Sequence, residues 1–444
     1  MFSFACRTVT GAGERILASP PTVAAGIPAM TVTVEPTASP EPSSSPMTTA
    51  TPPPTLTLTP HPTSAAWQIE VFEELWSVVN EEYLYPDFNG VDWEAVRREY
   101  LELVESGLEP EEFYLAMDEM IQLLGDDHSF FLDPTQVVEE NSELAGELEY
   151  VGVGILITTE PDRERAIVLL TFPDSPAERA GLRSRDIILA VDGAEVTGRE
   201  FNLGQLIRGP EGTEITLTVK SPGEEPRDVQ MVRGVVSGPL QVPYHALETE
   251  SGKRIGYILV PTFSDGTISG QVGNAIAAMS AEGPLEGIII DNRWNNGGVD
   301  TMLRGTLSFF VGGLAGYFVN NEGARAFTVN PDDIAGSQDV DLVVLIGRDT
   351  VSFGEIFAGI LSDLGRAYII GELTGGNVET LWGYDFSDGS RAWIAHDTFR
   401  PLNNPDLDWE QNGIVPDESV LAAWEEYQLE HDPVVRAALA HFDR

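Results

Sequence analysis

Cysteine is almost absent from this chain, because Cys6 is the single one. One thiol cannot form an internal disulfide, and neither a thiolate metal site nor a cysteine nucleophile finds support. Cys6 follows Phe4 and Ala5, as a lipid-attachment cysteine would, but the apolar stretch before it is shorter than a secretion signal requires. We therefore hold two hypotheses, an N-terminal lipid anchor at Cys6 and a cysteine without a role.

Basic residues are also scarce. The chain has 25 Lys and Arg against 71 Asp and Glu, which gives a net charge of -46, and its lysines are Lys220 and Lys253. Such a charge repels phosphate over most of the surface, so we expect neither nucleic acid nor anionic lipid as a partner. An acidic extracellular surface accounts for this composition, and adaptation to high salt is the alternative.

Long apolar runs and the common cofactor motifs are missing as well. No apolar run approaches the ~18 residues that would span a bilayer. The sequence has no His-Glu-x-x-His pattern and no phosphate-binding glycine loop with lysine, so we expect no metal and no organic cofactor. The 444 residues are 42% hydrophobic, which is enough for a packed core and for more than one domain.

The composition changes sharply near residue 67. Residues 19–66 are rich in proline, threonine, serine and alanine, and such a stretch buries too little apolar area to offset its ordering entropy. We expect residues 1–66 to form a disordered stalk, which favours an extracytoplasmic location, in the cell envelope or secreted. Three folded parts should follow, a helical domain over 67–145, a strand-rich module over 146–236 and a core over 237–444.

Hydrophobic periodicity predicts the elements of these parts. Val71, Leu75 and Val79 fall on one face of a helix that starts near Trp67 and that Pro86 ends, and two further helices are expected over 93–105 and 110–124. In the core we predict short buried strands at 255–260, 287–291 and 342–347, with helices at 270–279 and 353–364. Strand–helix alternation of this kind indicates a layered α/β core with parallel pairing, within a chain of mixed α/β and α+β class.

The segment 152–233 resembles a PDZ domain of the kind inserted in processing proteases. The matching stretches are Gly152-Val153-Gly154, Ser175-Pro176-Ala177, Ala180-Gly181-Leu182, Asp186-Ile187-Ile188 and Val191-Asp192-Gly193. Backbone amides around Gly152, Val153 and Gly154 can hold a terminal carboxylate, and the resemblance implies that a peptide adds as a strand beside them. Leu203 and Leu206 are the candidates for the far wall of the groove. The alternative is that the two glycines only permit a bulge.

Several patches of the core resemble the C-terminal processing peptidases, also called tail-specific proteases. They are Ile255-Gly256-Tyr257-Ile258, Asp291-Asn292-Arg293-Trp294-Asn295-Asn296-Gly297-Gly298, Ser352-Phe353-Gly354-Glu355-Ile356, Gly371-Glu372-Leu373-Thr374-Gly375-Gly376 and Asn412-Gly413-Ile414-Val415-Pro416-Asp417. The resemblance implies a crotonase-like or ClpP-like α/β core and a serine peptidase. Its protein or peptide substrates would carry apolar C-termini.

Ser352 is the nucleophile that this resemblance implies. A hydroxyl between a buried strand and a helix lies where backbone amides and the helix dipole favour negative charge. The resemblance makes the amides of Gly298 and Phe353 the expected oxyanion donors, and glycine at 297 and 298 allows close approach of the backbone. Without the resemblance, a helix N-cap would be the better interpretation of this serine.

The base differs from that of the best-known members, which use a lysine 25 residues after the serine. That position holds Asn377 here, and an amide cannot accept the serine proton. A second branch, which includes the tricorn-type proteases, uses histidine and glutamate. By resemblance to it we predict a triad of Ser352, His128 and Glu410, with His128 within hydrogen-bond reach of Ser352. His396 is the fallback base.

Two other functions remain open. Asn377 is also compatible with a catalytically inactive relative that acts as a tail-binding adaptor through its PDZ domain. The fold is further compatible with a carrier of small hydrophobic ligands. Reaction of Ser352 with a covalent serine probe would separate the enzyme from both.

Overall fold

The structure is a computed structural model of the chain, and it describes residues 6–8, 65–126, 128–147, 149–160, 165–196 and 203–444. The stalk predicted over 1–66 therefore lies outside the described residues, apart from 6–8 and 65–66. Residues Cys6–Thr8 form strand β1, whose backbone pairs in parallel with Thr380–Trp382. In the part of the chain that the structure describes, no helix is both long and apolar enough to cross a bilayer.

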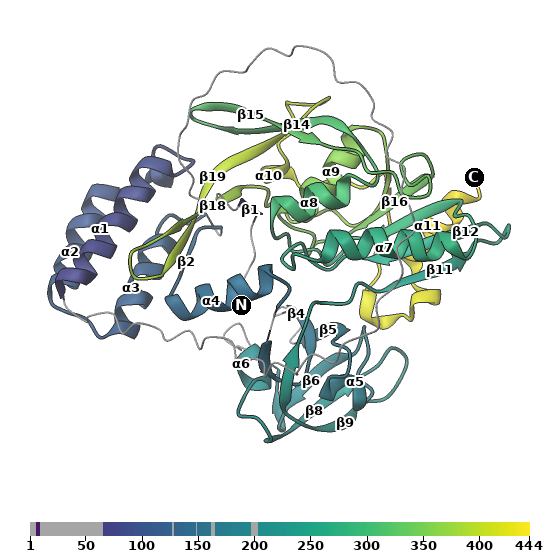
Figure 1. Cartoon of the computed structure of the whole chain (residues 1–444), viewed down its shortest axis with the longest axis horizontal. Helices are drawn as coiled ribbons and strands as arrows, with labels where there is room; N and C mark the ends of the chain where they lie inside the picture. Colours follow the sequence, from purple (N-terminus) through teal and green to yellow (C-terminus); the bar gives the residue numbers. More distant parts are fainter. Residues whose placement is uncertain (1–5, 9–64, 127, 148, 161–164, 197–202) are drawn as a thin grey trace, which may run out of the picture. The chain divides into compact units, whose positions relative to one another are not determined.

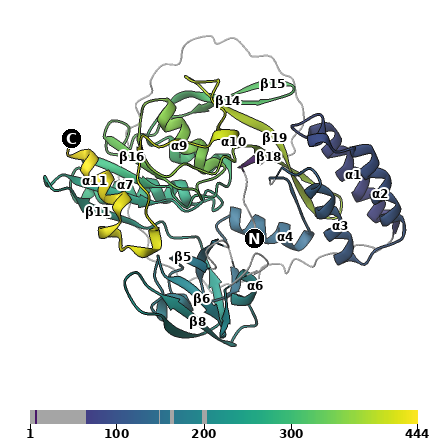
Figure 2. The same ribbon diagram turned by 180° about the vertical axis from the view of Figure 1, so that it is seen from behind.

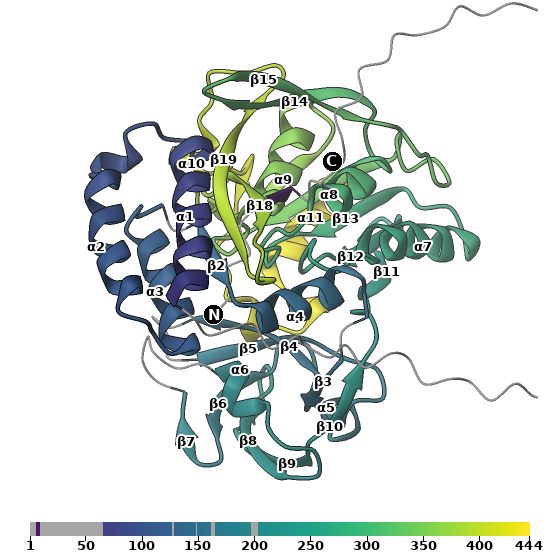
Figure 3. The ribbon, with the colours of Figure 1, turned by 60° about the vertical axis from the view of Figure 1, so that its left-hand side comes forward.

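Three helices of this region follow the predicted pattern, and a fourth, over 134–144, was not predicted. Its helices are α1 (Ala65–Glu82), α2 (Trp93–Glu105), α3 (Pro110–Gln122) and α4 (Pro134–Leu144), with a short 3-10 turn at Phe88–Gly90. Val71, Leu75 and Val79 are buried on one face of α1, as the periodicity predicts. Strand β2 (Phe130–Leu132) separates α3 from α4. These helices share an apolar cluster with β18 and β19, beside which Figure 3 shows α1.

The PDZ region is a sheet in the order β4-β5-β6-β8-β9, with β7 on the side of β6. Its strands are β4 (Ile155–Glu160), β5 (Arg165–Thr171), β6 (Ile187–Val191), β7 (Ala194–Glu195), β8 (Glu214–Lys220) and β9 (Arg227–Val232). Two short helices, α5 (Pro176–Arg179) and α6 (Leu203–Ile207), complete it. A separate ribbon of β3 (Glu149–Gly152) and β10 (Gly234–Ser237) joins it to the neighbouring regions of the chain.

The core is layered around one sheet in the order β11-β12-β13-β16-β17-β20, which is parallel from β12 onward. These strands are β11 (Tyr244–Glu248), β12 (Arg254–Leu259), β13 (Gly287–Asp291), β16 (Asp341–Ile346), β17 (Tyr368–Gly371) and β20 (Glu418–Ser419). Side chains alternate across it, because Ile288 and Ile290 join one apolar cluster and Ile289 joins another. Helices α7 (Ile268–Ala281) and α11 (Pro433–Phe442) contribute to these two clusters and lie on opposite faces (Figures 1 and 2).

A second, antiparallel sheet was not predicted from the sequence. It runs through β18 (Thr380–Asp385), β19 (Arg391–Pro401), β14 (Gly313–Asn320) and β15 (Gly323–Val329). Strand β2 pairs with residues 391–393 of β19, on the side away from β18. Helices α8 (Asp300–Leu307), α9 (Phe353–Asp363) and α10 (Trp409–Asn412) complete the core. Since β18 and β2 both run antiparallel to β19, their first residues lie toward the same end of it. This arrangement brings a loop from the front of the chain to segments near its end.

Candidate active site

Ser352 lies between β16 and α9 in a backbone conformation that serine seldom adopts. Its φ is 60° and its ψ is -133°, in the region that favours glycine, and its side chain is buried. Such a conformation costs of order 1–3 kcal/mol and persists only where surrounding contacts impose it. The amide of Ser352 donates to the carbonyl of Asn377 at 2.6 Å, and the amide of Val351 donates to the carbonyl of Asn295 at 3.0 Å.

The hydroxyl of Ser352 does not cap helix α9. No side-chain capping bond forms at this residue, and its Oγ has no hydrogen-bond partner among the described residues. A serine kept as an N-cap would use that oxygen to accept from the first turn of the helix. The observed geometry therefore disfavours the capping interpretation.

The glycine pair of the second core patch packs against this serine. Gly297 has a φ of +86°, and a Cβ added there would lie 2.4 Å from Oγ of Ser352 and 3.1 Å from the amide nitrogen of Phe353. Gly298 has a φ of +145°, and a Cβ there would lie 2.0 Å from the carbonyl carbon of Phe263. Only glycine fits at both positions. The expected oxyanion donors, the amides of Gly298 and Phe353, thus belong to segments that meet at Ser352.

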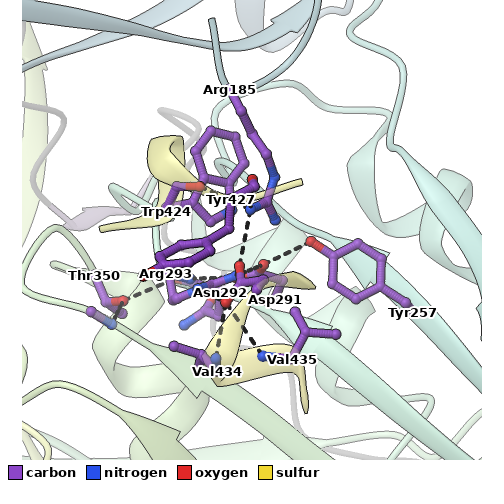
Figure 4. A network of polar contacts seen from close by, with 12 residues as sticks. Arg185, Tyr257, Asp291, Asn292, Arg293, Thr350, Trp424, Tyr427, Val434 and Val435 are labelled. Carbon is purple, nitrogen blue, oxygen red and sulfur yellow. Dashed lines mark hydrogen bonds and ion pairs between the residues drawn. The ribbon is translucent and has the colours of Figure 1, made fainter. Parts of the chain in front are cut away.

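A buried ion network supports the start of this glycine turn (Figure 4). Arg293 binds Asp291 at 2.6 Å and Asp432 at 2.8 Å, and Asp432 also accepts from Arg185 of the PDZ region at 3.0 Å. Tyr257 donates to Asp291 at 2.7 Å. Two carboxylates thus face two guanidinium groups, which compensates the buried charges.

His128 comes from the loop between α3 and β2, and Asp126 shapes that loop. The carboxylate of Asp126 accepts from the amides of His128 and Ser129, at 3.0 and 2.8 Å. The hydroxyl of Ser129 then accepts from the amide of Ala395 in β19 at 3.0 Å, which ties the loop to the second sheet. His128 is consequently buried, with 5% of its surface exposed.

Glu410 in α10 meets His128 as the sequence predicts. Its Oε1 lies 3.2 Å from Nε2 of the imidazole, and its Oε2 accepts from the amides of Val378 and Glu379 at 2.6 and 3.1 Å. Burial alone would lower the pKa of His128, but the bond to Glu410 and the charges of Glu379, Glu410 and Asp126 outweigh it and raise that pKa. Nδ1 of His128 has no hydrogen-bond partner among the residues described.

The hydrogen bond expected between His128 and Ser352 does not form in the described part of the chain. The two groups instead border the same short segment, because Asn377 holds the amide of Ser352 while the next two amides hold Glu410. The side chain of Asn377 does not replace the missing base, because its Oδ1 accepts no hydrogen bond within the described ranges. Lysine is not available either, since Lys220 ends β8 and Lys253 binds the carbonyl of Phe442.

Glu379 is a second carboxylate at the imidazole that the sequence analysis missed. Its Oε2 lies 3.5 Å from Nε2 of His128, and its Oε1 accepts from the hydroxyl of Tyr85. Burial raises the pKa of Glu379 to about 7. The charge of Glu410 adds to this increase, and the charge of His128 opposes it. No motif marks this residue in the sequence. It precedes β18 as His128 precedes β2, and the shared partner strand β19 brings the two together.

Glu355 is a further buried carboxylate in the serine patch. It accepts from the hydroxyl of Thr374 and from the amides of Gly376 and Asn377, at 2.9 and 2.7 Å for the two amides. Burial raises its pKa to about 7, although these hydrogen bonds oppose the shift. Its contacts fix the segment that carries Asn377, so Glu355 positions the site.

The other histidines are engaged elsewhere or lie away from Ser352. His396, the fallback base, stacks on Trp382 with ring centroids 4.0 Å apart, and it pairs with Asp397 at 3.2 Å and with Glu82 at 3.3 Å. His245 and His441 stack on Tyr257 and Tyr368. His431 lies in an exposed 3-10 turn, and His61 falls outside the described residues.

The PDZ region borders a cavity of about 370 Å³ beside strand β4. Ile155, Leu156 and Ile157 line one side of it, Gly204 and Ile207 of α6 line another, and α4 also contributes lining residues. The two predicted wall residues, Leu203 and Leu206, are not among the residues that line it. Leu203 is buried in the PDZ core, and Leu206 is 44% exposed. The helix lines the cavity with the residue that follows each of them, Gly204 and Ile207.

The predicted carboxylate loop lies directly before β4. Val153 is buried in the PDZ core, and its carbonyl accepts from the amide of Ala177. A Cβ on Gly152 would lie 2.8 Å from the ring of Tyr150, and one on Gly154 would lie 2.3 Å from Cβ of Ser175. Gly154, with a φ of +81°, is therefore required for packing, whereas a side chain at Gly152 would displace the ring of Tyr150.

Comparison with known families identifies each folded region. Residues 254–420 match Peptidase family S41, residues 173–221 match a PDZ domain, and residues 65–122 match the Tricorn protease C1 domain. A carboxyl-terminal-processing protease of Picosynechococcus is 31% identical over 362 residues, which cover 78% of this chain and 82% of that protein. One from Synechocystis is 30% identical over 355 residues, covering 78% of this chain and 79% of the relative.

Solved structures agree with these matches. The photosystem II D1 C-terminal processing protease superposes with a TM-score of 0.59 at 27% identity, and the match covers 84% of this chain and 97% of that one. Mature CPAF in complex with lactacystin shares the fold, with a TM-score of 0.52 at 14% identity over 85% of this chain and 99% of that one. The chain therefore belongs to the carboxyl-terminal-processing proteases of peptidase family S41, as a serine-type peptidase with a PDZ domain.

Proposed function

We propose that this peptidase cleaves protein tails through a triad of Ser352, His128 and Glu410. The observation that carries the proposal is the state of Ser352, a strained and buried serine whose hydroxyl makes no capping bond at the start of α9. Conformational strain of this kind concentrates at functional sites. The pairing of His128 with Glu410 at 3.2 Å supports the same assignment, because the two residues come from distant parts of the chain.

In this mechanism Nε2 of His128 carries the proton that is bonded to Glu410, which leaves Nδ1 as the base. Nδ1 takes the hydroxyl proton as Oγ of Ser352 attacks the scissile carbonyl carbon. The amides of Gly298 and Phe353 stabilise the oxyanion. The imidazolium then protonates the leaving amine, and a water molecule hydrolyses the acyl-enzyme by the same route. Nδ1 and Oγ both lack a hydrogen-bond partner among the described residues, so substrate binding has two free groups to bring together.

Tail recognition is assigned to the PDZ cavity. An extended peptide with an apolar C-terminus would add beside β4, with its last side chain against Ile155 and Ile207 and its carboxylate at Gly152, Val153 and Gly154. The composition of residues 19–66 supports a stalk and an extracytoplasmic location for this activity. A lipid anchor at Cys6 stays a hypothesis.

The competing function is a tail-binding adaptor without catalysis. Asn377 in place of a lysine favours it, as does the absence of a Ser352–His128 hydrogen bond within the described residues. A reporter protein with an apolar C-terminal tail separates the two functions. We expect mass spectrometry to find cleavage by the wild type, none by Ser352→Ala and at least 100-fold slower cleavage by His128→Ala, with His431→Ala as a surface control. Tail binding without cleavage by the wild type would establish the adaptor.

A further inference from the structure

Two carboxylates compete for one nitrogen at His128. Oε1 of Glu410 lies 3.2 Å from Nε2, and Oε2 of Glu379 lies 3.5 Å from the same atom. The single N–H at Nε2 can donate to only one of these oxygens, so the triad leaves the carboxylate of Glu379 without a donor at this nitrogen. Glu379 is 2% exposed, and its Oε2 has no hydrogen-bond partner in the described ranges. Burying a carboxylate oxygen without a hydrogen bond costs free energy unless a cation or a proton neutralises its negative charge.

The spacing of these atoms fits a small divalent cation. The imidazole nitrogen and the two carboxylate oxygens all lie within 4.8 Å of one another. Zn²⁺ binds histidine nitrogen and carboxylate oxygen at ~2.0–2.2 Å, which puts tetrahedral ligands about 3.3–3.5 Å apart. The two separations from Nε2, 3.2 and 3.5 Å, agree with that spacing. We propose that His128, Glu379 and Glu410 bind a zinc ion, which reversibly blocks the catalytic histidine.

The outer contacts of both carboxylates favour this site. Oε2 of Glu410 is held by the amides of Val378 and Glu379, and Oε1 of Glu379 is held by Tyr85. Each carboxylate therefore keeps its other oxygen directed at Nε2. Metal ligands in proteins are oriented by outer partners in this way. Three protein ligands leave the fourth position of a tetrahedral ion to water.

The ligand set also selects the kind of metal. Imidazole suits zinc and its transition-metal neighbours, whereas magnesium and calcium prefer six or more oxygen ligands. Zinc requires an unprotonated imidazole nitrogen and ionised carboxylates, so binding should weaken as the pH falls.

The inhibition follows from the atoms involved and rests on the proposed function. Zinc binds the lone pair of Nε2 in the neutral imidazole, so the single ring proton moves to Nδ1, and the ion occupies the oxygen of Glu410 that would stabilise an imidazolium. Nδ1 then has no lone pair to accept the hydroxyl proton of Ser352, and proton transfer stops. Binding itself needs no catalysis, so the metal site and the triad are tested separately.

Metal binding is measured on the full chain with Ser352→Ala, after removal of metals by a chelator. We expect titration calorimetry to show one zinc per chain, and cobalt(II) to give the intense visible absorption of a tetrahedral site. Glu379→Gln and Glu410→Gln should each weaken zinc binding at least tenfold, while Glu322→Gln, an exposed turn residue, should leave it unchanged. Zinc binding that both glutamine variants retain, or no binding below 100 µM, would overturn the proposal.

Inhibition is measured on proteins that keep Ser352, each against its own zinc-free rate. We expect added zinc to stop tail cleavage by the wild type and excess chelator to restore it. Glu379→Gln should raise the half-inhibitory zinc concentration at least tenfold. Zinc binding by a wild type that cleaves nothing would support the metal site and refute the triad. A cleaving wild type that zinc neither binds nor inhibits would refute the metal site and leave the triad standing.

Discussion

Replacing Glu379 with glutamine should stabilise the protein at alkaline pH and hardly at all at acidic pH. Glutamine has the shape of the protonated carboxyl, so its Oε1 can still accept from Tyr85. The folded-state pKa of Glu379 is raised from 4.5 to about 7 by burial and by Glu410. Between these two values the folded protein binds more protons than the unfolded chain, so stability falls as the pH rises.

The size of the effect follows from the two pKa values. With 4.5 in the unfolded chain and about 7 in the folded protein, the carboxyl of Glu379 lowers the free energy of unfolding by about 3 kcal/mol at pH 8. At pH 5 the same calculation gives less than ~1 kcal/mol. His128 acts in the same direction, because its raised pKa contributes stability below pH 6.5 that is lost as the pH rises through the folded value.

The assay is urea unfolding followed by tryptophan fluorescence at pH 5 and pH 8, with a chelator present. We expect the free energy of unfolding of Glu379→Gln to exceed that of the wild type by about 2–3 kcal/mol at pH 8. At pH 5 the two free energies should agree within about 1 kcal/mol. Glu102→Gln, on the exposed face of α2, should change neither value. A variant less stable than the wild type at pH 8 would refute the reasoning, because Glu379 would then be an ionised partner of His128.

Three further predictions concern the packing of the site and the groove. Asp432→Asn keeps the N-cap acceptor of α11 but removes the negative charge that faces the buried Arg185 and Arg293. The free energy of unfolding in urea should therefore fall by roughly 3–5 kcal/mol. An unchanged unfolding midpoint would contradict this. Gly297→Ala would put a Cβ 2.4 Å from the hydroxyl of the proposed nucleophile, so kcat/KM should fall at least 100-fold, whereas Gly336→Ala, with a similar φ of +85° and open space, should keep its rate. Ile207→Asp should raise the Kd for an apolar tail peptide at least tenfold in fluorescence anisotropy, while Leu206→Asp should not, and equal effects would reject the groove.

Local signals in the sequence predicted several elements to the residue. Strand β13 spans Gly287–Asp291, as expected, because three isoleucines lie between a glycine and a charged residue. Helix α2 spans Trp93–Glu105, and the side chain of Asp92 caps it by accepting from the amide of Ala95. Both features depend on neighbouring residues alone, so a single sequence is enough to find them.

Pairing between distant segments was harder to foresee. Strand β15 exposes most of its residues and β14 has an irregularity near Gly316, so neither has the alternation that marks a strand. The resemblance to known peptidases did predict that His128 and Glu410 meet. It gave no sign of Glu379, whose position depends on β2 and β18 pairing with opposite sides of β19.

The most direct test of the proposed mechanism is the reaction of Ser352 with a fluorophosphonate probe, with the adduct located by peptide mass spectrometry. We expect one adduct, on Ser352, at a rate that falls at least 100-fold in His128→Ala and substantially in Glu410→Gln, and that is unchanged in His431→Ala. Labelling of Ser352 at the wild-type rate without His128 would contradict the assigned base, and no labelling of the metal-free wild type would contradict the nucleophile.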